Sequence, residues 1–262
     1  MLQDILQARP LLWMLVRREL QARYAGSNIG AIWNLLHPIV LVAIYIAVFS
    51  RMMGQKVGVE PGRPDYLVHL TSGIIPWLMF SEILTRSCSV LIENANLLKK
   101  MAIPEEVLFL GVFITSFLVY GIAMVALIAL LLVMGVPLSP MVLFAFPVML
   151  ALGLAAMGAG MLLSVMNLLV RDVGQLVQIA LQLGFWSLPI VYFPSILGAR
   201  MQELIALNPF RGFFALIQLL FGSPEAAFLE DSYWMMVLLP FAAMVMGISF
   251  LRRQRPEILD AL

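Results

Sequence analysis

The sequence predicts an all-α integral membrane protein with six transmembrane helices, and three observations support this fold class. Hydrophobic residues make up 62% of the 262-residue chain and charged residues only 12%, whereas soluble domains are about 45–50% apolar and about 25% charged. The mean hydropathy is +0.99. Charge-free stretches recur with the length that one helical crossing needs, roughly 20 residues. Six crossings fit this length and twelve do not, which excludes a complete single-chain transporter of two six-helix halves, so we expect either half of a larger assembly or a small membrane protein.

Residues 1–28 are expected to form a cytoplasmic amphipathic helix before the first crossing. Pro10 suits the first turn of a helix. The apolar face that follows consists of Leu12, Trp13, Val16 and Leu20, and the polar face of Arg17, Arg18 and Gln21. Such a helix lies in the membrane interface. It is not a signal peptide, because its apolar core is too short and no small-residue cleavage pattern follows.

The first two crossings are expected at about residues 29–52 and 66–92. Residues 25–50 contain no charged side chain, and a charge at the bilayer centre costs on the order of 3 kcal/mol. The second crossing contains Glu82 and Arg86, which share one helix face at a spacing of four. We interpret them as a mutually neutralised structural pair.

Crossings 3 and 4 form a predicted hairpin at about residues 107–134 and 140–166. Residues 107–170 lack charge, and the segment 135–140 contains a glycine and two prolines that break the helix. Crossing 4 carries small residues at 153–160, which permit close helix packing. Packing within the chain is favoured over a contact between subunits.

Crossing 5 is expected at about residues 173–192, with Pro189 near its end, and crossing 6 at 233–251, closed by Arg252 and Arg253. Between them lie two apolar segments too short to span a bilayer. We expect this region, about 195–221, to form a pair of short re-entrant helices. Residues 29–262 are thus treated as one six-helix domain.

The distribution of Lys and Arg predicts that both termini are cytoplasmic, because positive residues accumulate in cytoplasmic loops. The side shared by the termini carries Arg9, Arg17, Arg18, Arg23, Lys99, Lys100, Arg171, Arg252, Arg253 and Arg255. The other side carries Arg51, Lys56, Arg63, Arg200 and Arg211.

The sequence lacks the residues and motifs that several kinds of chemistry require. One cysteine, Cys88, and two histidines, His37 and His69, provide neither a disulfide framework nor a metal cluster. The net charge of +1 argues against nucleic acid. No P-loop and no serine-hydrolase motif occurs. We therefore expect a non-enzymatic chain without its own cofactor.

The loop at residues 93–106 is amphipathic. Leu97, Leu98, Met101 and Ile103 are expected to project beside Lys99, Lys100, Glu105 and Glu106. The loop is either an ordinary positive loop or a docking surface whose apolar residues enter a partner's cleft.

The chain resembles the permease subunits of ABC transporters that export polysaccharides and polyol phosphates, such as O-antigen, capsular polysaccharide or teichoic acid. The motifs that carry this resemblance occur in order along most of the chain: Leu12-Trp13, residues 16–24, residues 27–33, Pro38, residues 98–108, residues 167–172, residues 188–192 and Asn208-Pro209.

This resemblance implies a homodimer that binds two copies of a separate ATPase, where ATP and Mg would act. The amphipathic helix would be the interface helix, with Arg17, Arg18, Arg23 and Tyr24 as its candidate residues. The coupling region would comprise Asn96, Leu97, Leu98, Lys99, Lys100, Met101, Ala102, Ile103, Pro104 and Glu105. Arg171 and Asp172 would lie at the cytoplasmic end of crossing 5.

Aromatic rings stack on the apolar C–H faces of sugars with little demand for a particular sugar. The candidate channel residues are Trp33, Tyr45, Phe49, Trp77, Phe80, Phe185, Trp186 and Tyr192. Each could instead belong to an interfacial belt or to packing. Arg23, Arg51 and Arg86 are candidates for binding a pyrophosphate headgroup.

We therefore expect a multi-pass permease in the bacterial plasma (inner) membrane that exports a lipid-linked polysaccharide with energy from its ATPase partner. An ABC permease for lipids or drugs and an ion-coupled secondary carrier remain the alternatives.

Overall fold

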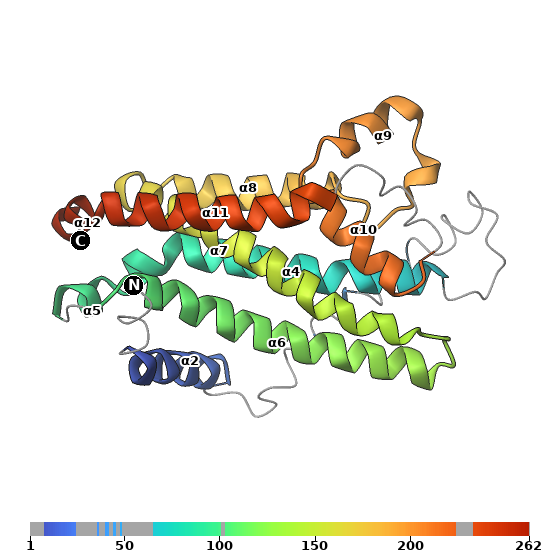
Figure 1. The fold of residues 1–262 in the computed structure, drawn as a ribbon, viewed down its shortest axis with the longest axis horizontal. Coiled ribbons are helices and arrows are strands. Elements are labelled where there is room, and N and C mark those ends of the chain that lie inside the picture. Colours follow the sequence, from blue (N-terminus) through green and yellow to red (C-terminus); the bar gives the residue numbers. More distant parts are fainter. Residues whose placement is uncertain are drawn as a thin grey trace.

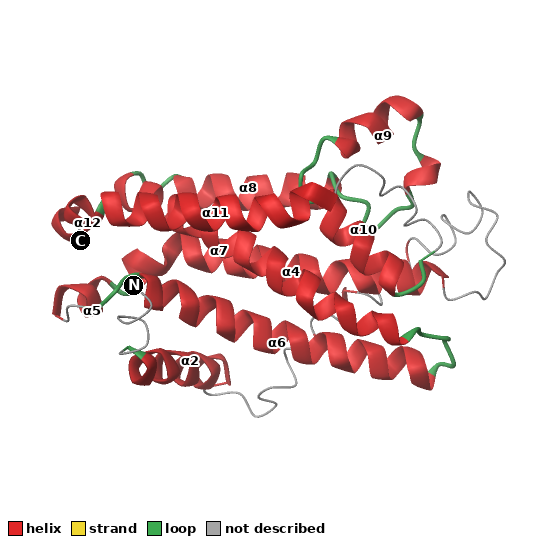
Figure 2. Ribbon diagram, viewed as in Figure 1, coloured by secondary structure: helices red, strands yellow, loops and turns green. Residues whose placement is uncertain are grey.

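The computed structural model describes residues 8–24, six separate positions between 36 and 48, and residues 65–100, 103–223 and 233–261. This described part consists of helices joined by short loops (Figure 2), and it contains no β-strand. Four helices are long and apolar enough to cross a membrane, or five elements if one bent pair counts as a span. Crossing 1, predicted at 29–52, lies mostly outside the described residues.

The four long helices agree with predicted crossings 2, 3, 4 and 6. They are α4 (Asp65–Glu93), α6 (Glu106–Val133), α7 (Ala145–Leu169), which the short 3-10 helix η1 (Pro140–Phe144) precedes, and α11 (Tyr233–Arg253). The break between α6 and α7 lies where the glycine and prolines predict it. Gly135 turns the chain with a φ of 76°, and the Ser139 side chain caps η1 by accepting a hydrogen bond from the Met141 N–H.

Helix α7 is the central helix, packed against α4 on one side and α11 on another. Gly160 lies against Ser87 of α4, and Gly158 lies against the backbone of α11 at Ala243. A Cβ atom at either glycine would overlap these neighbours. The small residues of crossing 4 therefore pack within the chain, as the sequence analysis favoured.

Predicted crossing 5 is shorter than expected. Helix α8 (Val173–Trp186) ends six residues before the predicted boundary, and 14 residues give about 21 Å of helix, less than the roughly 30 Å of a hydrocarbon core. Residues 187–193 form turns in which Pro189 and Ile190 are buried. The helix predicted over 173–192 thus ends at Trp186, because side chains from two other helices hold residues 187–193 in turns. The role of this segment as a membrane crossing stays a prediction.

Short helices follow α8, as predicted for residues 195–221. They are the 3-10 helix η2 (Pro194–Ile196), α9 (Ala199–Ala206) and α10 (Arg211–Leu220). Helices α9 and α10 meet at an angle of 103°. Phe213, Phe214 and Ile217 of α10 are fully buried, so α10 is part of the core. The re-entrant character of the pair stays a prediction.

The remaining helices gather at one end of the bundle. Helix α2 (Arg9–Tyr24) lies along the first turns of α6, and α5 (Ala95–Lys100) and α12 (Arg255–Ala261) lie at the same end, whereas α9 and the α6–α7 connection lie at the other (Figure 1). The cytoplasmic orientation of the first end stays a prediction.

Candidate functional site

A cleft of about 640 Å³ opens between α4 and α8. Helix α6 contributes Tyr120 to its wall, and the described positions Leu41 and Tyr45 close another side. Its polar lining consists of Ser81, Glu82, Thr85, Arg86, Gln178 and Gln182, together with the hydroxyls of Tyr45 and Tyr120. The cleft combines aromatic rings, amides and hydroxyls with one acid and one base.

Three of the predicted channel aromatics meet in this cleft. The ring centroids of Tyr45 and Phe185 are 6.1 Å apart, and those of Trp77 and Phe185 are 5.7 Å apart. Together they form an aromatic wall of the cleft, with Trp77 from α4, Phe185 from α8 and Tyr45 from outside both helices. Aromatic pairs at this separation are mutually stabilising and keep their ring faces fixed.

The other aromatic candidates lie elsewhere. Phe80 lines a different cavity and packs against Phe210 with ring centroids 4.8 Å apart. Trp186 is half exposed, and its carbonyl accepts a hydrogen bond from the Tyr192 hydroxyl at 3.0 Å. Neither Trp186 nor Tyr192 lines the cleft. Trp33 and Phe49 lie outside the described residues.

The amide side chains of α8 face polar groups of α4 across the cleft. Gln178 donates a hydrogen bond from Nε2 to the Thr85 hydroxyl at 3.3 Å, and Gln182 follows one helical turn later on the same wall. Amides and hydroxyls both donate and accept. This wall can therefore hydrogen-bond the hydroxyls of a sugar in either sense.

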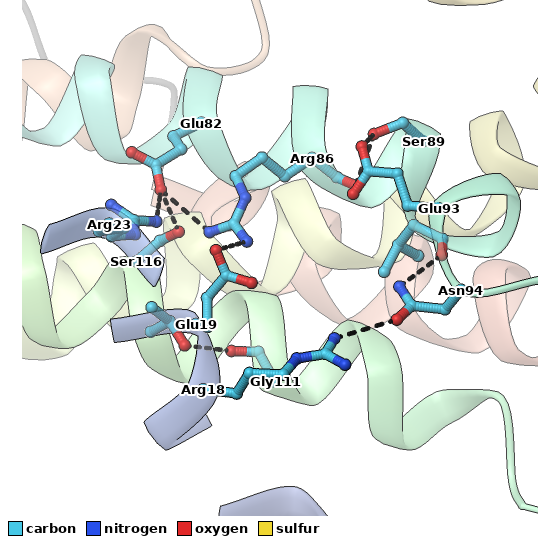
Figure 3. Close-up of polar contacts among 12 residues, drawn as sticks. Arg18, Glu19, Arg23, Glu82, Arg86, Ser89, Glu93, Asn94, Gly111 and Ser116 are labelled. Atoms are coloured by element: carbon cyan, nitrogen blue, oxygen red, sulfur yellow. Dashed lines mark hydrogen bonds and ion pairs between the residues drawn. The ribbon is translucent and has the colours of Figure 1, made fainter. Parts of the chain in front are cut away.

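Glu82 and Arg86 belong to a chain of four charges rather than to an isolated pair (Figure 3). Arg23 of α2 contacts Glu82, Arg86 contacts Glu82 at 3.4 Å, and Glu19 of α2 contacts Arg86. The four side chains are 17–32% exposed. The predicted pairing of Glu82 with Arg86 is confirmed, but the closer partner of each comes from α2.

Helix α6 completes the environment of the Glu82 carboxylate. Ser116 donates a hydrogen bond to Oε1 at 2.8 Å, and Tyr120 donates to Oε2 at 3.0 Å. A carboxylate away from bulk water needs such compensation, because an unpaired charge is costly to desolvate. Glu82 therefore ties together α2, α4 and α6 at the wall of the cleft.

This arrangement argues against the predicted headgroup role for two of the arginines. Arg23 and Arg86 are each engaged by a carboxylate of the same chain, so binding a phosphate would require breaking these pairs. The third candidate, Arg51, lies outside the described residues. Among the residues that the structure describes, no three His, Cys, Asp or Glu side chains come close enough to hold a metal ion.

Helix α2 forms where the interface helix is predicted, and the face that it buries on the bundle differs from the predicted apolar face. Its position in the membrane interface stays a prediction. Leu15 and Val16 are buried against α6, whereas Trp13 and Met14 are 66% and 58% exposed. Trp13 therefore does not belong to the face that packs on the bundle. Arg17 is exposed, Arg18 donates to the Asn94 side chain at 3.3 Å, and the Tyr24 side chain is outside the description.

The predicted coupling region forms α5 and a buried return to α6. Leu98 and Ile103 are 5% and 8% exposed, so they pack on the chain itself and do not project. Asn96, Lys99 and Lys100 are exposed, Leu97 and Pro104 are half-buried, and Met101 and Ala102 lie outside the described residues.

Two ion pairs attach the start of α6 to the C-terminal helices. Arg252 pairs with Glu106 at 3.0 Å, and Arg255 pairs with Glu105 at 2.9 Å. Glu105 is thus buried and paired rather than free for a partner. At the neighbouring α7–α8 turn, Arg171 and Asp172 are exposed. Asn167 of α7 accepts a hydrogen bond from the Gly174 N–H of α8 and donates one to the Cys88 carbonyl of α4, so it joins α7 to both helices.

A second polar cluster, absent from the sequence analysis, holds the turns after α8. Gln218 of α10 donates to the Pro189 carbonyl at 2.9 Å, His69 of α4 lies 3.2 Å from the Tyr192 carbonyl and 2.9 Å from the Ser223 hydroxyl, and Tyr66 donates to the Val191 carbonyl at 3.0 Å. His69 and Gln218 are each 1% exposed. The sequence does contain a signal for this cluster, because His69 and Gln218 are polar residues that each lie within an apolar segment.

Comparison with known proteins gives a consistent result. The family model for ABC-2 type transporters matches residues 10–221. An O-antigen export system permease protein RfbA from Klebsiella pneumoniae is 28% identical over 76% of this chain and 75% of its own length. A protein of the same name from Myxococcus xanthus is 28% identical over 80% of this chain and 79% of its own. The polysialic acid transport protein KpsM from Escherichia coli is 25% identical over 40% of this chain and 44% of its own length.

Proposed function

Because this chain belongs to the ABC-2 type transporter family, we propose that it is the membrane-spanning permease subunit of an exporter that moves a lipid-linked polysaccharide across the bacterial inner membrane. The observation that carries the proposal is the cleft between α4 and α8, where an aromatic wall faces amide and hydroxyl groups. The relatives named as O-antigen export permeases support the same substrate class.

The cleft suits a glycan for physical reasons. The rings of Tyr45 and Phe185, with the buried Trp77 packed beside Phe185, provide apolar surface for the C–H faces of sugars. Gln178 and Gln182 offer hydrogen bonds to hydroxyls. The charges at the wall are already paired within the chain, so the cleft binds sugars through stacking and neutral hydrogen bonds and tolerates different repeat units.

ABC-2 permeases are non-catalytic membrane subunits, and the family implies an ATPase partner. In our proposal two copies of this chain form a homodimer that binds two ATPase subunits, with ATP and Mg held there. In this proposal, residues 1–28 serve as the interface helix and residues 29–262 form a single six-helix domain. Both termini lie in the cytoplasm. The α9–α10 pair then lies on the external side, opposite α5 (Figure 1).

The ATPase is proposed to dock on the end of the bundle that carries α5. Lys99 and Lys100 are exposed there, and Arg17 is exposed on α2. Since Leu98 and Ile103 are buried, recognition of α5 depends on its basic and polar side chains more than on apolar ones. Within the coupling region, residues 96–105, the contact is therefore assigned to the exposed positions.

The decisive experiment is co-purification of the tagged chain with the ATPase encoded nearest to its gene, read as subunit stoichiometry and ATP turnover, together with deletion of the gene in its host. We expect a stable complex with two copies of each subunit and loss of surface polysaccharide in the deletion strain. If the complex assembles on co-purification but the deletion strain keeps its surface glycan, the result would indicate lipid or drug export. Transport that persists without an ATPase and collapses with the ion gradient would indicate a secondary carrier.

A further inference from the structure

Helix α8 contacts the bundle along a narrow seam. Among its 14 residues, all of which are described, only Val177 and Leu181 are buried. Beside Leu181, the edge of Trp77 fits against Gly184, where a Cβ atom would lie 3.1 Å from the ring. The two sides of this seam are hollow, and the cleft described above occupies one of them.

The other side holds a second cavity of about 420 Å³ between α4, α7, α8 and the start of α10. Its described lining is aliphatic and aromatic apart from Asn208. The amide of Asn208 is already satisfied, since it donates to the Ser187 hydroxyl at 2.8 Å and accepts from the Phe210 N–H at 3.0 Å. An apolar cavity of this kind excludes water and accepts a hydrocarbon ligand.

The two hollows adjoin at the seam, because Trp77 and Leu181 line both of them. Their chemistry is opposite: the cleft contains Glu82, Arg86 and two glutamines, whereas the second cavity is apolar apart from the amide of Asn208, which is already hydrogen-bonded. A molecule with a polar part joined to a hydrocarbon chain can therefore fill both at once by passing around Trp77. A sugar alone or an acyl chain alone fills only one.

We propose that the second cavity binds the hydrocarbon chain of the substrate while the attached glycan lies in the cleft. This inference rests on the proposed function, because it takes the substrate to be a lipid-linked glycan. Trp77 then separates the two hollows and sets the position at which the polar and apolar parts of the substrate join. A bilayer phospholipid is the competing occupant, but its headgroup carries no sugar rings to stack on the aromatic side chains of the cleft.

The test uses two photoreactive probes with the full chain, co-expressed with its ATPase and placed in phospholipid nanodiscs. One probe is a long-chain alkyl oligosaccharide with a diazirine in its alkyl chain, and the other is a phosphatidylethanolamine with a diazirine in its acyl chain. Labelled peptides are identified by mass spectrometry. The informative variant is Ala180→Phe, since Ala180 lines the cavity yet is exposed on α8, so the larger ring fills the cavity without entering the core.

Ala129→Phe is the matched control, because Ala129 is exposed on α6 and lines neither hollow. The glycoside probe is expected to label residues 159–166 and 173–188, and Ala180→Phe should reduce this labelling about tenfold while Ala129→Phe leaves it unchanged. Absence of labelling by the glycoside, equal labelling by the phospholipid, or insensitivity to Ala180→Phe would each overturn the inference. The proposed function is judged separately, by ATPase association and surface glycan, so either can fail alone.

Discussion

Glu19 of α2 contacts Arg86 of α4, and one turn away on both helices Arg23 contacts Glu82. The order of the pairs is antiparallel, since the later residue of α2 meets the earlier residue of α4. This double contact attaches the N-terminal helix to the wall of the cleft (Figure 3). The same helix reaches Asn94, just before α5, through Arg18. Helix α2 therefore bridges the proposed ATPase-docking end and the cleft.

The chain of four charges predicts that replacing Arg23 lowers the stability of the protein, whereas replacing the exposed Arg17 does not. Arg23→Ala leaves Glu82 without its closest cation, and we expect a loss of about 1–3 kcal/mol, below the 3–5 kcal/mol of a fully buried pair because these side chains are partly exposed. The measurement is the thermal unfolding temperature of the purified chain. Arg17→Ala is the control, since Arg17 is exposed on the same helix. A double exchange, Arg23→Glu with Glu82→Arg, should recover part of the loss. Equal stability of wild type and Arg23→Ala would contradict a supporting role for this chain.

The exposed lysines of α5 are expected to carry ATPase docking. Lys99→Glu combined with Lys100→Glu reverses two charges without touching the core, so the chain should remain folded and lose the ATPase on co-purification, by at least about tenfold in bound ATPase. Arg200→Glu, a single charge reversal at an exposed position of α9 at the opposite end, is the control. Normal ATPase binding by the double variant would refute the assignment of α5.

Leu98 is expected to behave differently from its lysine neighbours. Its side chain is 5% exposed, and truncation of a buried leucine typically costs about 2–5 kcal/mol. Leu98→Ala should therefore lower the unfolding temperature of the isolated chain, whereas Lys99→Ala should not. Unchanged stability of Leu98→Ala would mean that α5 is not packed as described.

The cleft predicts variants that assemble normally and export poorly. Phe185→Leu removes an aromatic face between Tyr45 and Trp77, and Gln182→Leu removes an amide from the exposed wall. Each should retain the ATPase and reduce surface glycan about three- to tenfold, equivalent to the roughly 0.5–1.5 kcal/mol of one aromatic contact or hydrogen bond. Phe241→Leu on the exposed face of α11 is the control. Wild-type export by both cleft variants would direct the search for the glycan path elsewhere.

The polar cluster after α8 predicts a local effect. Gln218→Leu leaves the Pro189 carbonyl without its donor, and a buried unsatisfied group costs about 1–3 kcal/mol. Amide hydrogen exchange at Ile190 and Val191 should accelerate, while exchange in the core of α6 should not change. Uniform acceleration through all helices would instead indicate global destabilisation.

The periodic and compositional features of the chain were sufficient for most of its helices. Charge-free stretches located α6, α7 and α11, and a stretch with only two charges located α4, each to within a few residues, because a helix that leaves water must satisfy its backbone internally and carry few charges. The break at Gly135 followed from local backbone chemistry in the same way. The resemblance to polysaccharide exporters agreed with the family match.

Contacts between distant parts of the chain determine the features that local sequence patterns do not predict. Hydropathy extended crossing 5 to residue 192, but Gln218, His69 and Tyr66 hold the turns from residue 187 onward. A spacing of four paired Glu82 with Arg86, yet the nearest charges come from α2, more than 50 positions away along the chain. Leu98 and Lys99 looked equivalent in an amphipathic loop until packing buried one and exposed the other.

The sequence by itself thus determined which segments leave water, since the transfer of apolar and charged groups depends on composition alone. Only the tertiary structure decided which side chains meet. The aromatic wall, the four-charge chain and the two hollows beside α8 arise between helices distant in sequence, because directional contacts between side chains depend on how the helices pack and not on how each is composed.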